Sequence, residues 1–222
     1  MGKLDFSILL PDLTKALWET GIMVSISLLL ALLLGLPLGF GVFLTRRGML
    51  WENRILNWVG EIGINLIRSL PFVILLILIL PLALVVTGRT TGPYAASVPL
   101  AIASIAFYAR LVEGALCEVS SGVIEAARAH GASDWLLIRR VLFPESLAGL
   151  LRGFTVTAIS LVGYSAMAGV VGGGGIGFLA INYGYYRYET GVMIITVVIL
   201  IVLVQILQSL GDFITHRIDH KK

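Results

Sequence analysis

Five windows of the chain carry no charged side chain, and the charged residues gather between them. These windows cover residues 20–45, 69–88, 90–109, 153–186 and 190–211. Each reaches the roughly 20 residues that an α-helix needs to cross the hydrocarbon core of a bilayer. The pattern predicts an all-α membrane protein with five transmembrane helices.

The composition agrees with this prediction and excludes a soluble globular domain. Hydrophobic residues make up 58% of the chain and charged residues 13%, whereas about 25% are charged in an ordinary soluble domain. The mean hydropathy is +0.96. The net charge of +3 arises in the loops, so it indicates membrane topology rather than a nucleic-acid site. The single cysteine, Cys117, excludes an internal disulfide and is expected to be a small apolar filler on a membrane helix.

Lysine and arginine are distributed unevenly between the two sets of loops. One set follows the first, third and fifth windows and contains Arg46, Arg47, Arg54, Arg128, Arg139, Arg140, Arg152, Arg217, Lys221 and Lys222. The other set contains Lys3, Lys15, Arg89 and Arg187. By the positive-inside rule, the N-terminus lies outside and the C-terminus in the cytoplasm. No repeat or linker divides the chain, so residues 1–222 are expected to form a single membrane domain.

Three polar or small-residue patterns lie within or beside the predicted spans. Gly35 and Gly39 have the spacing of a close helix contact, although Pro37 between them could instead only kink the helix. Glu61, Asn65 and Arg68 fall on one helix face just before Pro71. Snorkelling of the side chain at the cytoplasmic surface explains Glu61. The role of Arg68 stays open. Arg110 and Glu113 lie three residues apart and are expected to pair.

The segment "GVIEAARAHGASDWLLIRRVLFPES", residues 122–146, is an exception in this apolar chain because it is rich in charge. It reads as two short helices. Ser120 and Ser121 can cap the first, Glu125 is expected in its first turn, and Gly131 follows its end. Ser133 can cap the second, with Asp134 in its first turn, Arg139 and Arg140 in its last, and Pro144 stopping it. The predicted cytoplasmic insert therefore covers residues 120–144, between the third and fourth spans.

Small and weakly apolar residues form a stripe along the first of these helices. The stripe consists of Val123, Ala126, Ala127 and His130. Small side chains allow another surface to approach closely. Periodicity alone leaves two interpretations open, a helical hairpin lying on the protein's own spans and a docking surface for a separate protein.

The same segment resembles the EAA motif of bacterial ABC importer permeases. Glu125, Ala126, Ala127, Gly131, Val141 and Pro144 have the spacing of that motif, whereas Phe143 stands where leucine is usual. The resemblance implies that the insert is a coupling helix seated in a cleft of a cytoplasmic ATPase subunit. The chain would then be a transport subunit and not an enzyme, with ATP bound by the partner ATPase and no cofactor or metal of its own.

Further segments are similar to the permeases of methionine importers. They are "NLIRSLPFVILL" (65–76), "FYARLVEGAL" (107–116), "LVGYSAMAGVVGGGGIG" (161–177) and "NYGYYRY" (182–188). The resemblance implies a homodimer in the bacterial inner (plasma) membrane, two cytoplasmic ABC ATPase subunits and an external methionine-binding lipoprotein. A permease of the same architecture for another amino acid or small solute is the alternative.

"GGGGIG" at residues 172–177 formally fits a nucleotide-binding glycine pattern. Phe178 and Leu179 occupy the places where a phosphate loop needs Lys and Ser or Thr, and a membrane span precedes the glycines. Nucleotide binding is therefore not expected. Instead the glycines predict a mobile or tightly packed hinge at the outer end of the fourth span, formed by Gly172, Gly173, Gly174, Gly175 and Gly177.

Ser165 and Met167 in "GYSAM" each allow two interpretations. Ser165 could be the nucleophile of an intramembrane serine protease, but His130, His216 and His220 lie in or beside cytoplasmic segments and Met167 stands where that motif has glycine. Met167 itself could fill a packing gap. Its small neighbours favour a gate in which two copies of Met167 meet at the axis of a dimer.

Four tyrosines gather in the outer loop before the fifth span, at positions 183, 185, 186 and 188. An aromatic belt at the membrane surface accounts for most of them. Their concentration beside Arg187 also suits docking of the external binding protein, with Tyr185, Tyr186 and Arg187 as the expected contacts.

Overall fold

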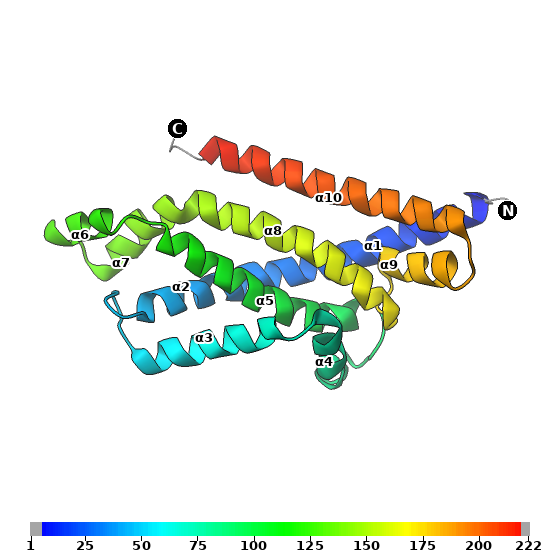
Figure 1. Ribbon diagram of the computed structural model, residues 1–222, viewed down its shortest axis with the longest axis horizontal. Coiled ribbons are helices and arrows are strands. Elements are labelled where there is room, and N and C mark those ends of the chain that lie inside the picture. Colours follow the sequence, from blue (N-terminus) through cyan, green and yellow to red (C-terminus); the bar gives the residue numbers. More distant parts are fainter. Residues whose placement is uncertain (1–5, 219–222) are drawn as a thin grey trace.

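The computed structural model describes residues 6–218, and the side chains of residues 10–218. The sequence-based predictions for Lys3, His220, Lys221 and Lys222 lie outside the described residues. Within 6–218 the chain forms helices joined by short turns, with no strand. The long helices run side by side in an elongated bundle, with the described N- and C-terminal ends toward opposite ends of its long axis (Figure 1).

The first membrane helix is continuous from α1 to α2. α1 (Phe6–Leu30) passes through a π-helical turn, η1 (Ala31–Gly35), into α2 (Leu36–Thr45). Pro37 lies in the first turn of α2. Proline has no N–H to donate and its ring crowds the carbonyl four residues earlier, and a π turn just before it relieves both problems.

The glycines of this helix make the close contact that their spacing indicated. A Cβ on Gly39 would lie 2.5 Å from the Ala109 carbonyl oxygen and 2.6 Å from Val112 Cβ, both on α5 (Pro93–Cys117). Gly35 lies almost as close to α5, at the Ile105 carbonyl oxygen. The two helices therefore pack backbone to backbone, and the close-contact interpretation is confirmed.

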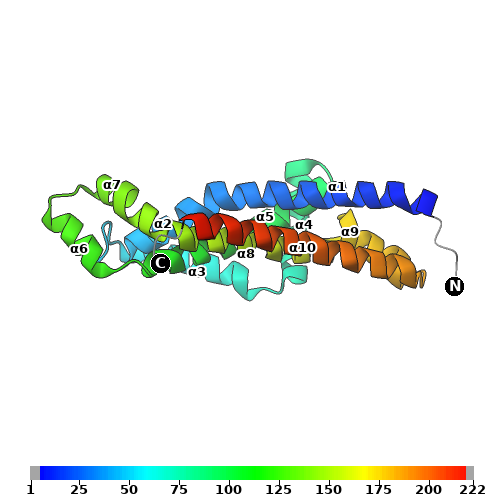
Figure 2. The ribbon, with the colours of Figure 1, turned by 90° about the horizontal axis from the view of Figure 1, so that it is seen from above.

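The second predicted span is a bent pair of helices rather than one straight helix. α3 (Arg54–Ser69) is capped by the Asn53 side chain, which accepts hydrogen bonds from the amides of Ile55 and Leu56 at 3.1 Å. α4 (Phe72–Thr87) follows a break at Pro71 and is turned by 110° from α3. In Figures 1 and 2 it runs across the long axis of the bundle.

The structure therefore contains, within the described residues, four helices that are long and apolar enough to cross a membrane, or five if the bent pair is one span. The four are the helix from Leu10 to Thr45, α5, the helix from Asp134 to Val170, and α10 (Thr190–Ile218). The prediction of five spans is supported only when α3 and α4 are counted together, because α4 alone has 16 residues.

α5 is the central helix of the bundle. Its residues Leu100, Tyr108, Val112 and Leu116 are fully buried. Helices α1, α2, α3, α4 and α8 (Phe143–Val170) all pack against it. α10, by contrast, lies at the edge of the bundle along α8, as Figure 1 shows.

Candidate functional site: the two ends of the bundle

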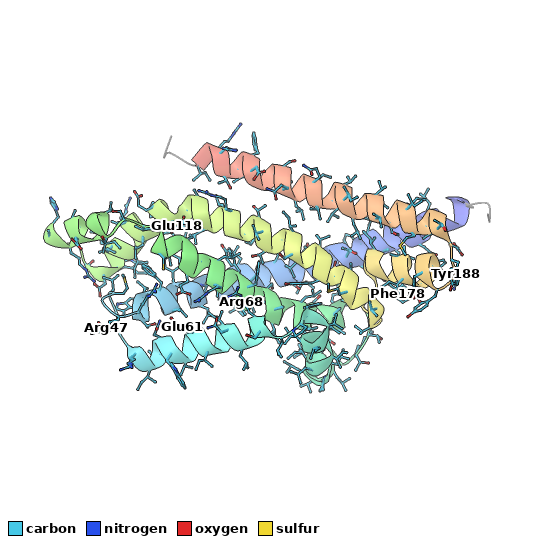
Figure 3. The ribbon with its side chains drawn as sticks, viewed as in Figure 1. Arg47, Glu61, Arg68, Glu118, Phe178 and Tyr188 are labelled. Carbon is cyan, nitrogen blue, oxygen red and sulfur yellow. The ribbon has the colours of Figure 1, made fainter. Side chains whose placement is uncertain are left out.

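The charged insert forms one tip of the molecule. α6 (Ser121–Ala129) and α7 (Asp134–Leu137) extend beyond the other helices at the end where α2 meets α3 and where α10 ends (Figures 1 and 2). Arg47 and Glu118 lie near this end, whereas Phe178 and Tyr188 lie at the opposite one (Figure 3). The Trp51 indole N–H donates to Asp134 Oδ2 at 3.2 Å. This bond ties the α2–α3 loop to the insert.

The local structure of the insert agrees with the sequence analysis in part. Gly131 has φ +77° after α6, as a left-handed residue at a helix end should. Ser133 caps α7 by accepting from the Leu136 amide at 3.4 Å, and Asp134 lies in the first turn. Ser120 stands at the N-cap of α6 but its side chain makes no capping hydrogen bond, and Glu125 lies beyond the first turn. Glu125 is the fifth residue of α6, so the prediction that it lies in the first turn was wrong by one residue.

Pro144 does not end the second helix, contrary to the prediction. α7 continues through a π turn, η2 (Ile138–Leu142), directly into α8, so that one helix runs from Asp134 to Val170. Pro144 lies in the first turn of α8, just after that π turn. The physical reason is the same as at Pro37: the wider turn accommodates a residue that has no N–H.

The stripe on α6 faces in two directions. Ile124 and Ala127 pack against a buried cluster of the protein's own core, and Val141 of η2 joins them. Val123, Ala126 and His130 are exposed. Among the other motif residues, Glu125, Gly131 and Pro144 are exposed as well. The hairpin interpretation thus holds for one edge of the stripe, and the rest is left uncovered.

The exposed surface of the insert is more apolar than the motif alone indicated. Trp135 and Leu136 on α7 are 67% and 49% exposed, and Val123 on α6 is 41% exposed. Sequence reasoning missed Trp135 and Leu136 because the short helix offered too few residues for a periodic pattern. Ala126 is exposed as well, so both helices of the insert carry exposed apolar side chains, a feature that is typical of protein interaction sites when such side chains lie together.

Polar and charged side chains lie on and beside the last turns of α5, the end of that helix that leads into the insert. Arg110 Nη1 and Glu113 Oε2 are 2.5 Å apart, so the predicted pair is confirmed. The Glu113 side chain is only 7% exposed. Arg46 Nη1 lies 3.1 Å from Cys117 Sγ at the end of α5. Cys117 is exposed, so the expectation of a packed apolar filler was wrong.

Replacing Arg110 with leucine is expected to destabilise the protein by about 1–3 kcal/mol, the cost of leaving a buried polar group without its partner. The double variant Arg110→Leu/Glu113→Gln is expected to be more stable than the single variant, because the uncompensated negative charge is gone. The melting temperatures of the purified detergent-solubilised variants test this ordering. Equal melting temperatures would mean that Glu113 does not depend on Arg110.

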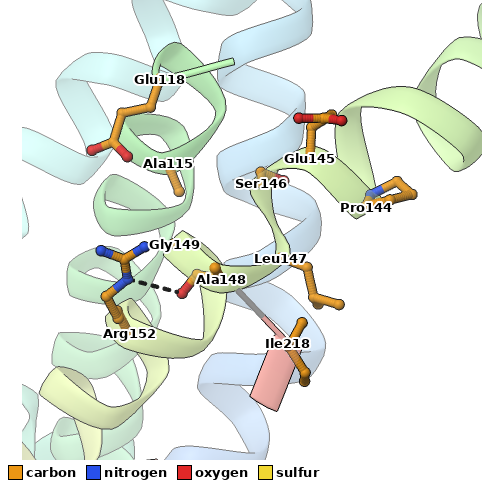
Figure 4. Close-up of a pocket in the computed structure, with 10 residues that line it drawn as sticks. All are labelled: Ala115, Glu118, Pro144, Glu145, Ser146, Leu147, Ala148, Gly149, Arg152 and Ile218. Carbon is orange, nitrogen blue, oxygen red and sulfur yellow. Dashed lines mark hydrogen bonds between the residues drawn. The ribbon is translucent and has the colours of Figure 1, made fainter. Parts of the chain in front are cut away.

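A cavity of about 460 Å³ lies beside the insert. Its lining comes from the end of α5, the first turns of α8 and the last described residue of α10 (Figure 4), namely Ala115, Glu118, Pro144, Glu145, Ser146, Leu147, Ala148, Gly149, Arg152 and Ile218. Arg152 Nε donates to the Ala148 carbonyl at 3.3 Å. Among the residues that the structure describes, no three His, Cys, Asp or Glu side chains are placed to hold a metal ion.

At the opposite end, the glycine-rich segment forms a tight turn. Gly172, Gly174 and Gly175 have φ between +80° and +83°. The Gly173 amide donates to the Ala168 carbonyl at 2.9 Å, and the Gly172 carbonyl accepts from the Gly92 amide at 2.9 Å. Gly177 lies in α9 (Gly175–Leu179), against the Ala166 backbone. Of the two expectations for this segment, the packing favours the tightly packed turn.

Met167 and Ser165 lie on α8 near this turn but in different surroundings. Met167 is 45% exposed, and a Cβ on the nearby Gly163 would meet open space. Beside them Tyr164 stacks on Phe72 of α4, with ring centroids 4.5 Å apart. Ser165 is buried and donates to the Val162 carbonyl at 2.7 Å. His130 and His216 lie toward the other end of the bundle, so they and Ser165 do not form a catalytic group.

The tyrosines surround the end of η3 (Ala180–Tyr185) and the turn before α10. Tyr185, Tyr186 and Tyr188 are 63%, 64% and 86% exposed. Tyr183 is partly buried, and its hydroxyl donates to Asp12 Oδ2 at 3.3 Å. Arg187 is exposed and lies over the Tyr183 ring, 4.3 Å from its centroid. Three exposed rings and a cation therefore form one patch at the end opposite the insert.

Comparison with known proteins identifies close relatives. Residues 31–220 match the family described as binding-protein-dependent transport system inner membrane component. The chain is 47% identical over 209 residues to the probable D-methionine transport system permease protein MetI of Vibrio cholerae serotype O1, covering 94% of this chain and 93% of that protein. It is 46% identical over 180 residues to the methionine import system permease protein MetP of Bacillus subtilis, covering 81% of each.

A solved structure has the same fold. A chain in an inward-facing conformation of the MetNI methionine ABC transporter superposes with a TM-score of 0.92 and 40% sequence identity, covering 99% of this chain and 100% of that chain.

Proposed function

The chain belongs to the family of binding-protein-dependent transport system inner membrane components, and we propose that it is the membrane-spanning permease subunit of an ATP-driven importer for methionine. The observation that carries this proposal is similarity along almost the whole chain to permeases named for methionine transport. It extends to the fold of a chain in the MetNI transporter. The protein is a multi-pass component of the bacterial inner membrane.

The assembly that follows has two copies of this chain, two cytoplasmic ABC ATPase subunits and an external methionine-binding lipoprotein. ATP binds to the ATPase subunits, and the permease itself carries out no covalent step and needs no cofactor or metal. Residues 1–222 act as one transmembrane domain, embedded in the lipid bilayer, with residues 120–144 as its coupling segment. The exposed apolar surface of α6 and α7 supports a docking role for this segment.

In the proposed topology the N-terminus faces outward and the insert and C-terminus face the cytoplasm. The distribution of cations between the two ends supports it. The described arginines of the insert end are Arg46, Arg47, Arg54, Arg128, Arg139, Arg140, Arg152 and Arg217, and the opposite end has Lys15, Arg89 and Arg187. α3 and α4 together serve as the second span, because α2 ends near the insert while Gly92 bonds to the glycine turn at the other end.

Transport follows alternating access. When ATP draws the ATPase subunits together, their docking clefts move the coupling residues Glu125, Ala126, Ala127, Gly131, Val141 and Pro144. The helix from Asp134 to Val170 is unbroken, and its 33-residue reach from Asp134 to Met167 corresponds to about 50 Å at 1.5 Å per residue. A continuous helix of this length carries motion from the cytoplasmic docking surface to the outer half of the membrane.

At the outer end we assign three roles. Met167 is the gate, because it is exposed on α8 beside open space at Gly163. Gly172, Gly173, Gly174, Gly175 and Gly177 let the chain turn sharply and pack closely between α8 and α9. Tyr185, Tyr186 and Arg187 contact the binding protein through an exposed patch of aromatic rings and positive charge.

Uptake by a reconstituted complex tests the proposed function. The permease is co-purified with its ATPase subunits, placed in proteoliposomes with ATP inside, and supplied outside with its binding protein and radiolabelled methionine. ATP-dependent accumulation that unlabelled methionine competes away is the expected result. No accumulation of labelled methionine, with ATP-dependent accumulation of a different labelled amino acid or small sulfonate, would instead favour an importer of the same architecture for that solute.

A further inference from the structure

The first amides of α9 are bound by side chains from the other end of the sequence. The Gly175 amide donates to Glu19 Oε2 at 2.8 Å, and the Ile176 amide donates to Thr20 Oγ1 at 3.0 Å. Both acceptors belong to α1, 156 residues earlier in the chain. The Glu19 side chain is only 20% exposed and Thr20 is 2% exposed. These four residues are called the clasp.

The clasp replaces a cap that α9 cannot make for itself. The first amides of a helix have no partner within the helix and normally bond to the side chain of the N-cap residue. Here the N-cap residue is Gly174, which has no side chain. Glycine is also required at the next position, because a Cβ on Gly175 would lie 2.6 Å from Thr20 Oγ1. α1 therefore completes the start of α9.

The rest of α9 and η3 is also attached to α1. Ile176 and Leu179 are buried together with Ala16 of α1. One turn beyond them, Tyr183 donates to Asp12. Polar and apolar contacts thus extend along the whole outer part of α1, and the exposed tyrosine patch follows directly.

The other side of α9 lies against α8 without intervening side chains. A Cβ on Gly177 would overlap the Ala166 carbonyl oxygen, and one on Gly169 would overlap the Phe178 amide nitrogen. Ala166 and Gly169 flank Met167. Backbones in direct contact cannot approach further, so the position of α9 constrains where this part of α8 lies, in addition to the direct packing of α8 on α1.

We propose that Glu19 and Thr20 are positioning residues for transport. Through the clasp they hold α9 to α1, so that the outer part of α1, α9 and the exposed tyrosine patch move as one body and set the position of the α8 segment that carries Met167. This inference rests on the proposed function. It adds a route by which contact with an external protein at the tyrosines reaches α8, and it gives roles to two residues that no sequence motif marked.

Substitutions of nearly equal size test the clasp. Thr20→Val removes only the acceptor oxygen, and methionine uptake by the reconstituted complex is expected to fall about tenfold, the effect of one buried amide left unsatisfied. Thr20→Ser keeps the hydroxyl, so its uptake is expected to be restored relative to Thr20→Val. Glu19→Gln keeps an acceptor oxygen, so its uptake is likewise expected to be restored relative to Glu19→Leu. Thr14→Val is the matched control on α1, because Thr14 is exposed and bonds only to the Pro11 carbonyl of its own helix.

ATPase activity without the binding protein separates positioning from simple damage. It is expected to stay within twofold of the unaltered complex in Thr20→Val, while the stimulation of ATPase activity by the binding protein is lost. Uptake by Thr20→Val equal to that of the control would overturn the inference. Failure of the unaltered complex to take up methionine would instead overturn the proposed function.

A reversible crosslink tests the movement itself and does not depend on the stability of the variants. Asp12 and Tyr183 are both changed to cysteine in a Cys117→Ser background, with cysteine-free partner subunits, and are joined by a short bis-methanethiosulfonate reagent. If α1 moves as one body with α9 and η3, uptake by the complex crosslinked between α1 and η3 is expected to stay within twofold of the same complex before crosslinking. Loss of uptake on crosslinking, with recovery after reduction, would show that α1 and the α9–η3 segment must separate and would overturn the inference.

Discussion

Ala126→Asp is expected to abolish methionine uptake while leaving the permease folded. Ala126 is exposed on α6, on the uncovered part of the stripe. In the proposed complex this surface lies in the ATPase cleft, where an unpaired carboxylate costs about 3 kcal/mol or more, equivalent to a loss of roughly 100-fold in coupling. Uptake in proteoliposomes, together with the amount of ATPase subunit that co-purifies with the permease, measures the effect.

Ser121→Asp provides the matched control for this substitution. Ser121 is exposed on the same helix, about 140° around it from Ala126 at 100° per residue, and an acidic residue suits its first turn. Uptake is expected to remain near that of the unaltered complex. Ala127 is less suitable for the test because it packs on the protein's own core. If Ala126→Asp assembles and transports normally, α6 is not the coupling surface.

Gly39→Val is expected to prevent accumulation of folded permease. The added side chain would overlap the Ala109 carbonyl and Val112 Cβ on α5. Neither neighbour can rotate away, because one is backbone and the other is the branch point of its side chain. The cost should therefore reach or exceed about 3 kcal/mol, the upper end of the range for overpacked cores.

Gly41→Val is the control on the same helix, because a Cβ on Gly41 would have no atom of another helix within 4 Å. Fluorescence-detected size-exclusion chromatography of detergent extracts compares the two variants. The control is expected to give a monodisperse peak of normal height, and Gly39→Val little or none. A normal peak for Gly39→Val would mean that α2 and α5 do not depend on this contact.

Much of the fold could be predicted from periodicity and charge. Charge-free windows located the long helices because lipid does not tolerate unpaired charge, and this constraint acts on every residue of a span. The close contact at Gly39 and the pairing of Arg110 with Glu113 also followed from spacing along one helix. The bend between α3 and α4 could not be predicted in the same way, since Pro71 indicates a break but not the direction of the chain after it.

The candidate site was predictable where it depends on local sequence. Gly131 and Ser133 were assigned correctly because a left-handed helix end and an N-cap are local requirements. The roles of Thr20 and Glu19 were not predictable, because their partners are amides 156 residues away. The residue types in the sequence do not distinguish one backbone amide from another, so nothing in the sequence indicates that these two amides bond to Thr20 and Glu19.

Two of the three π turns, η1 (Ala31–Gly35) and η2 (Ile138–Leu142), lie inside long helices and change how helix faces should be counted in this protein. Each accommodates one residue more than an ordinary α-helix would in the same length. A helical wheel drawn straight through Ala31–Gly35 or Ile138–Leu142 therefore goes out of phase by one residue, or about 100°, on its far side. The helix face on which a later position such as Gly39 lies therefore has to be counted from the far end of the π turn. The same holds for every position that follows the π turn in either helix.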